Sequence, residues 1–221
     1  MKPFGIFLSG CGYQEGTDIW ETVLLNYFLE EKKIKTIFLY SVPNSLDKAT
    51  GNTKVNQISS KNILAEASLM AKGNLKELSD TGSENLDALI LPGGEGIIKK
   101  FTQRDENNPV LKIDPELKKF IRETYRRKKP IAGCGLASLV IASALKDIVA
   151  TPLNLTSGND PGVSEQLERM GVNHIITKAD EAVIDSDNRL VTTPGSKMKS
   201  NLSELGKGLK NIIDGILELT K

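Results

Sequence analysis

Four short apolar runs constrain the fold of this chain more than any other feature. They cover residues 6–8, 37–39, 89–91 and 131–132, and each gives way within two residues to glycine, serine or proline. Runs that are short and apolar throughout are typical of strands buried on both faces, as in a parallel sheet. Helical patterns lie between them. The sequence therefore predicts right-handed crossovers and an α/β, doubly wound, mainly parallel sheet between helices.

The remaining segments follow from periodicity and turn residues. Beyond Leu145 the pattern changes, and 149–157, 182–184 and 190–192 are predicted to be short strands. The last two are joined by a turn at 185–189, which predicts a small antiparallel hairpin. Two polar stretches, 42–60 and 102–115, are each interpreted as a surface loop or a small excursion near the sheet edge. Helices are predicted over 19–28, 63–70, 117–125, 161–170 and 202–217.

Composition excludes several classes of protein. A chain of 221 residues without a linker or repeat is predicted to form one domain over 1–221. Lys and Arg number 29 against 28 Asp and Glu, so no broad field attracts nucleic acid or anionic lipid. No apolar run approaches the roughly 18 residues of a membrane span, so a soluble protein is expected.

Cysteine and histidine are scarce. Two cysteines and one histidine give neither a disulfide scaffold nor the usual zinc ligands, so no metal is expected. The thiols suggest a reducing compartment, and the amino terminus resembles a first strand rather than a signal peptide. These two features together predict a cytoplasmic protein.

Three glycine-rich turns are expected at the carboxyl ends of the strands, where open α/β sheets bind ligands. They span 9–12, 92–96 and 133–135. Any tight turn between a strand and a helix also favours glycine. The first turn misses the dinucleotide-binding spacing by one residue and no P-loop is present, so no nucleotide cofactor is expected.

The third turn has the strand, bend and helix order of a nucleophile elbow. A Cys134 thiol at this bend would be activated by the helix amino terminus, and Glu21 on the first helix would lie at the same edge. The alternatives are an inert buried thiol and an acid that only interacts with the helix dipole. The single histidine, His174, is interpreted as structural.

Several segments in order resemble the ElbB (enhancing lycopene biosynthesis) family of isoprenoid biosynthesis proteins. This family is a branch of the ThiJ/PfpI class I glutamine amidotransferase-like superfamily. The segments are Leu8-Ser9-Gly10-Cys11-Gly12, Gly16-Thr17-Asp18-Ile19-Trp20-Glu21, Leu89-Ile90-Leu91-Pro92-Gly93-Gly94-Glu95-Gly96, Lys129-Pro130-Ile131, Met170-Gly171-Val172-Asn173-His174 and Asp185-Ser186-Asp187-Asn188-Arg189.

The resemblance implies a flavodoxin-like fold with an elbow cysteine and an adjacent acid, which matches Glu21. It also implies a backbone oxyanion site at Gly93 and Gly94, completed by the elbow amides of Gly135 and Leu136. Relatives are linked to glyoxalase-like conversion of methylglyoxal and glyoxal to hydroxy acids without a cofactor. A homo-oligomer and a small carbonyl substrate or metabolite are expected as partners.

The chain departs from the family at the nucleophile. Aligned without a gap from Lys129-Pro130, the family cysteine falls on Gly135, and Cys134 lies one residue early, facing the packing side of the strand. With one residue deleted from the strand, Cys134 would occupy the elbow. We favour the gapless alignment, and Cys11 is then the alternative pocket thiol.

Two hypotheses follow from the two alignments. In the first, Cys134 attacks an aldehyde and Glu21 moves the proton. In the second, the protein binds a metabolite or has a regulatory role, because Gly135 has replaced the nucleophile.

Overall fold

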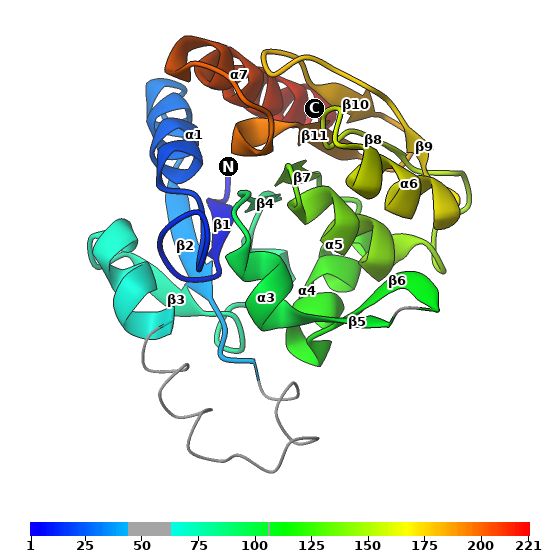
Figure 1. The fold of residues 1–221 in the computed structure, drawn as a ribbon. Coiled ribbons are helices and arrows are strands. Elements are labelled where there is room, and N and C mark those ends of the chain that lie inside the picture. Colours follow the sequence, from blue (N-terminus) through cyan, green and yellow to red (C-terminus); the bar gives the residue numbers. More distant parts are fainter. Residues whose placement is uncertain (44–62, 106) are drawn as a thin grey trace.

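The computed structural model describes residues 1–43, 63–105 and 107–221 (Figure 1). At its centre is a sheet in the order β10-β11-β7-β4-β1-β2-β3. Neighbouring strands run parallel except β10 and β11, which form an antiparallel hairpin. The predicted flavodoxin-like fold and its hairpin are confirmed. The strands are β1 (Phe4–Leu8), β2 (Thr36–Tyr40), β3 (Leu75–Glu77), β4 (Ala88–Leu91), β7 (Ile131–Cys134), β10 (Val183–Asp185) and β11 (Leu190–Thr193).

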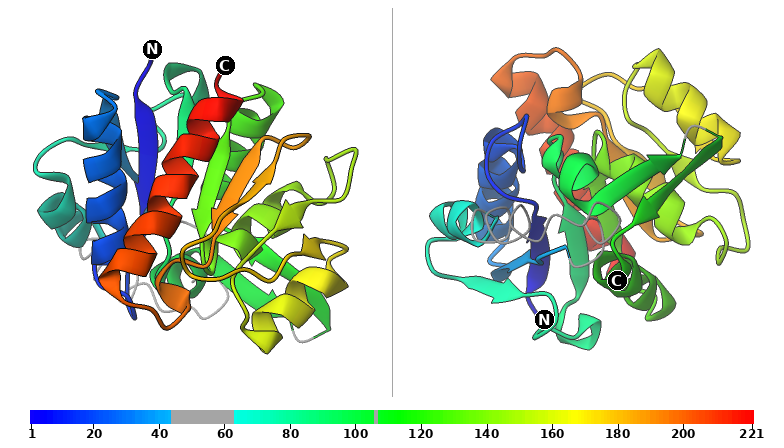
Figure 2. Two further views of the ribbon diagram at one scale, coloured as in Figure 1. Left: turned by 90° about the horizontal axis from the view of Figure 1, so that it is seen from above. Right: turned by 60° about the horizontal axis from the view of Figure 1, so that its bottom comes forward.

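Helices cover both faces of the sheet. On one face α1 (Ile19–Glu31) lies beside α7 (Leu202–Leu219), as Figure 2 shows. Their inward side chains form a hydrophobic cluster with alternate residues of the central strands. The other face is covered by α3 (Gly96–Phe101), α4 (Pro115–Arg126) and α5 (Ala137–Leu145), which form a second cluster.

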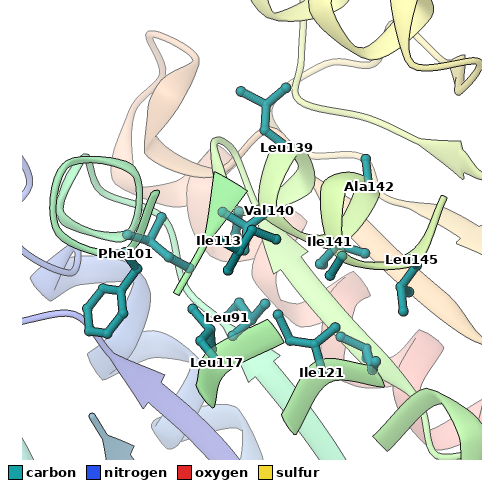
Figure 3. Packing of buried hydrophobic residues seen from close by; sticks show 14 of the residues in the cluster. Leu91, Phe101, Ile113, Leu117, Ile121, Leu139, Val140, Ile141, Ala142 and Leu145 are labelled. Carbon is teal, nitrogen blue, oxygen red and sulfur yellow. The ribbon is translucent and has the colours of Figure 1, made fainter. Parts of the chain in front are cut away.

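Helix α5 is the most deeply buried helix described, and it begins at the predicted elbow. All nine of its residues are buried. Figure 3 shows Val140 and Ile141 of this helix in one cluster with Leu91 of β4 and with Leu117 and Ile121 of α4. A helix that is apolar on all sides has to be internal. The bend before α5 is therefore held firmly against the sheet.

Smaller elements complete the chain. They are η1 (Ser83–Asn85), η2 (Gly195–Lys197), α6 (Pro161–Arg169), the parallel pair β8 (Asn154–Leu155) and β9 (Asn173–His174), and a helix over 63–71. None of the described helices is both long and apolar enough to cross a membrane.

One of the two polar stretches has regular secondary structure that was not predicted. Residues 102–115 contain an antiparallel hairpin of β5 (Thr102–Asp105) and β6 (Asn108–Ile113). Leu111 and Ile113 are buried, with exposed Lys112 between them, and the Leu111 N–H donates to Ser143 Oγ of α5 (3.0 Å). This alternation was too short to stand out among polar residues. The loop predicted at 42–60 lies almost wholly outside the described residues.

Candidate functional site

Glu21 occupies the first turn of α1, at the carboxyl end of the parallel strands. The helix begins after Asp18, whose carboxylate accepts from the Glu21 N–H (3.0 Å). The Glu21 side chain is wholly buried. Its Oε2 accepts from the Gly93 N–H and its Oε1 from the Ser196 N–H, both at 2.6 Å. One carboxylate thus joins α1, the turn after β4 and η2.

The surroundings of Glu21 favour its neutral form. Burial raises its pKa to about 7, and the nearby Asp18 carboxylate adds to the effect. The two backbone N–H donors oppose this shift because they stabilise the charged form. Glu21 therefore changes protonation state near neutral pH.

Cys134 lies directly beside this acid, and both are sealed. It is the last residue of β7, it is wholly buried, and it belongs to the cluster beneath α1 and α7. Burial, followed by the charge and hydrogen bonding of Glu21, holds the pKa of the Cys134 thiol well above its usual range.

Gly195 closes the space over the Glu21–Cys134 pair. A Cβ at this position would lie 2.4 Å from Glu21 Oε1 and 3.1 Å from Cys134 Cβ. The Cys134 thiol and the Glu21 carboxylate lie side by side, as the enzyme hypothesis requires, but both are buried inside the protein.

The residue at the bend between β7 and α5 is Gly135. Its φ is +52°, in the left-handed region, and its N–H donates to Thr193 O (2.9 Å). A Cβ there would lie 3.0 Å from both Lys197 Cβ and Pro194 O. This geometry favours the gapless alignment, in which the elbow position has no side chain.

The turn after β4 is used differently from the predicted oxyanion site. The Gly93 N–H is already bonded to Glu21, so it does not point to a free ligand position. Gly94 has φ +101°, and a Cβ there would lie 2.3 Å from Gly16 O. The Asp18 N–H donates to Gly93 O (2.9 Å). These two glycines let the turn pack closely on the loop before α1.

An open cleft of about 480 Å³ lies next to the bend, and neither Glu21 nor Cys134 lines it. Leu136, which precedes α5, and Lys197 of η2 line it. Lys197 pairs with Asp160 (3.1 Å), and Lys99 pairs with Glu95 (3.1 Å). The remaining lining residues are Ile98, Arg104, Gly162, Val163 and Gln166.

Arg104 is the cleft residue that sequence reasoning missed. It is exposed on β5, and in the part of the chain that the structure describes no carboxylate pairs with it. Its segment was interpreted as a loop, so nothing in the sequence linked it to the elbow. With the other charges paired, Arg104 gives the cleft an available cation.

Comparison with known proteins connects these features to relatives. No family model matches the chain. The mitochondrial ES1 protein homolog of Rattus norvegicus is 29% identical over 222 residues, covering 97% of this chain and 83% of the rat protein. The mitochondrial glutamine amidotransferase-like class 1 domain-containing protein 3 of Homo sapiens is 28% identical, with 97% and 82% covered.

A solved structure gives the most informative match. The isoprenoid biosynthesis protein with an amidotransferase-like domain from Ehrlichia chaffeensis has a TM-score of 0.81 at 26% identity, covering 98% of this chain and 99% of that one. Over nearly its whole length this chain is similar to class I glutamine amidotransferase-like proteins, among them an isoprenoid biosynthesis protein. Glyoxalase III from Candida albicans shares the fold, with a TM-score of 0.64 at 15% identity and 97% of each chain covered.

The cytoplasmic location predicted for this chain is wrong. The curated relatives from R. norvegicus, H. sapiens and Danio rerio are all named mitochondrial. The prediction relied on few thiols and a short apolar first strand. Free thiols suit any reducing compartment, so the sequence argument could not choose among them.

The second thiol of the chain, Cys11, does not lie at the elbow. Cys11 is half-buried and lines a different hollow, beside α1. Burial and the Glu66 carboxylate raise its pKa, while Lys100 opposes the shift. Its N–H donates to Glu66 Oε2 (3.1 Å), and Glu66 also pairs with Lys100 (3.2 Å).

The remaining polar candidates have structural partners. His174 Nε2 accepts from the Ser157 N–H (3.3 Å), and Ser138 Oγ donates to Thr156 O (2.7 Å). No group of three or more His, Cys, Asp or Glu suited to a metal occurs among the described residues.

Proposed function

We propose that this protein binds a small anionic metabolite in the cleft beside Gly135 and does not convert it through a cysteine. The observation that supports this most directly is the residue at the bend. Gly135 adopts the left-handed conformation there and has no side chain that could attack a substrate. The role would be regulatory, in the metabolic setting that the name of the E. chaffeensis relative indicates.

The chemistry of the sealed pair supports the same conclusion. Covalent attack on an aldehyde needs a thiol that can reach the carbonyl carbon and give up its proton. Cys134 is wholly buried, and its pKa is raised. The N–H of Gly93, which would stabilise charge on the oxygen, is held by Glu21.

The class of ligand follows from the cleft. Two lysines there are neutralised by Asp160 and Glu95, which leaves the Arg104 guanidinium for a ligand. A guanidinium matches a carboxylate in shape and charge. We therefore expect a small carboxylate.

Glyoxalase-type activity is the competing candidate, because Cys134 and Glu21 do lie together. Incubation with methylglyoxal in the absence of glutathione separates the two. We expect no consumption above the protein-free rate, and no change in Cys134→Ala. Consumption that disappears in both Cys134→Ala and Glu21→Gln would overturn the proposal.

Binding itself is tested by calorimetry with pyruvate as the probe. We expect wild type to bind pyruvate, and we expect Arg104→Glu to weaken this binding about tenfold or more. Arg126→Glu, at an exposed position of α4 outside the cleft, is the matched control and should bind like wild type. An Arg104→Glu variant that binds pyruvate as wild type does would contradict the assignment of the cleft.

A further inference from the structure

A second hollow, of about 1050 Å³, lies away from the cleft and shares no lining residue with it. It runs between α1 and the helix of residues 63–71, beside strand β2. In Figure 1 these two helices flank β2. Its volume is just above the range of roughly 300–1,000 Å³ that is typical of small-molecule pockets. We call this hollow the α1 groove.

Apolar side chains from both helices line the α1 groove. Ile19, Val23 and Tyr27 form a stripe at spacings of four residues along α1, and about half of each side chain is exposed. Leu69 faces them from the other helix and is 78% exposed. The inward face of α1 already packs through Leu25 and Leu29, so this outer stripe does not serve the core.

Three lysines gather at one end of the α1 groove. Lys33 and Lys35 lie between α1 and β2, while Lys72 follows the other helix. The two segments are tied together by a hydrogen bond from Asn74 Nδ2 to Thr36 O (2.6 Å). None of the three lysines has an ion-pair partner among the described residues. Among those same residues, Glu30 is the one carboxylate that lines the groove.

Two of these lysines occupy unusual backbone positions. Lys33 has φ +59° and Lys72 has φ +46°, both just beyond a helix end. Glycine adopts this left-handed conformation at lower cost than any other residue. A lysine at each position gives the groove end a positive side chain that glycine could not supply.

We propose that the α1 groove binds a single-chain amphiphile with a carboxylate head, of the fatty-acid class. The chain lies along the Ile19–Val23–Tyr27 stripe, and the carboxylate lies among the three lysines. An apolar trough with unpaired cations at one end is complementary to such a molecule in both parts. This site is independent of the cleft beside Gly135.

Calorimetry with laurate and decanoate, below their micellar concentrations, tests the apolar half of the proposal. Each buried methylene changes affinity about fourfold, so laurate should bind roughly sixteenfold more tightly than decanoate. Val23→Asp, at a half-exposed position, should abolish binding of both. Circular dichroism checks that the variant is folded.

The charged half is tested with Lys35→Glu combined with Lys72→Glu. We expect laurate binding to weaken about tenfold or more, while Lys146→Glu at the end of α5 leaves it unchanged. Pyruvate binding at the cleft should persist in all these variants, which separates failure here from failure of the proposed function.

Laurate binding that is absent, or insensitive to Val23→Asp, would overturn the proposal. So would a dimer in sedimentation velocity that Val23→Asp dissociates and laurate does not, because the groove would then hold a second copy.

Discussion

The Glu21–Cys134 pair shows how one position in a strand changes the chemistry available to a residue. Cys134 lies one residue before the bend, so its thiol faces the packed side of β7. There, burial and a neighbouring carboxylate raise its pKa instead of lowering it. The same two functional groups then lie within the packed interior and not in an open site.

Glu21 should make stability depend on pH. Its pKa is about 7 in the folded protein and near 4.5 when exposed, so the folded state binds the extra proton between these values. The free energy of unfolding should therefore fall as pH rises from about 5 to 8, by at most about 3 kcal/mol. Urea unfolding at several pH values measures this slope, and Glu21→Gln should flatten it. An equal slope in both proteins would show that other groups titrate.

Gly195 should be intolerant of a side chain. In Gly195→Ala the new methyl group would meet Glu21 Oε1 at 2.4 Å, at a backbone φ of +57°. We expect a loss of about 2–4 kcal/mol in unfolding free energy. Gly206→Ala in α7 is the control, because nothing lies within 4 Å of its Cβ, and it should be neutral or stabilising. Similar effects of both substitutions would refute the close packing around Glu21.

The gapless alignment predicted that Cys134 faces the packed side of its strand, and Cys134 is wholly buried. The sealing of Glu21 was not predicted. Two-residue alternation along a strand is local, so it fixes which face a residue occupies. The cover over Glu21 comes from Gly195 and Ser196, which follow it by more than 170 positions. No local pattern connects such distant segments.

At the scale of elements, the sequence predicted most accurately the segments with a strong period or a clear cap. The buried strands and the 202–217 helix were predicted correctly, within a few residues at the ends. The β5–β6 hairpin was not, because its pairing depends on packing against α5. Arg104, which the cleft depends on, was missed for the same reason.

Helix α7 provides a test of these local rules. Asn201 accepts from the Glu204 N–H (3.0 Å), and Glu204 accepts in return from the Asn201 N–H (3.1 Å), which forms a capping box. Asn201→Ala should cost about 1 kcal/mol in urea unfolding. Ser203→Ala, at an exposed position two residues after Asn201, should change the unfolding free energy little. A neutral Asn201→Ala would indicate that packing alone sets where α7 begins.

At the scale of the whole molecule, two hydrophobic clusters share one sheet. Strand β4 contributes Leu89 and Leu91 to one cluster and Ile90 to the other. Neither cluster can lose its sheet face without exposing the other, so we propose that residues 1–221 unfold as one cooperative unit. Cys134, within the sheet, should then become accessible only when the whole unit opens.

Alkylation of Cys134 in a Cys11→Ser background tests the central claim most directly. Intact mass after treatment with iodoacetamide, at increasing urea, measures the modified fraction. The account predicts no modification of the native protein, and labelling that rises together with loss of the helical circular dichroism signal. Rapid modification without urea at neutral pH would place a reactive thiol in the cleft and contradict the account.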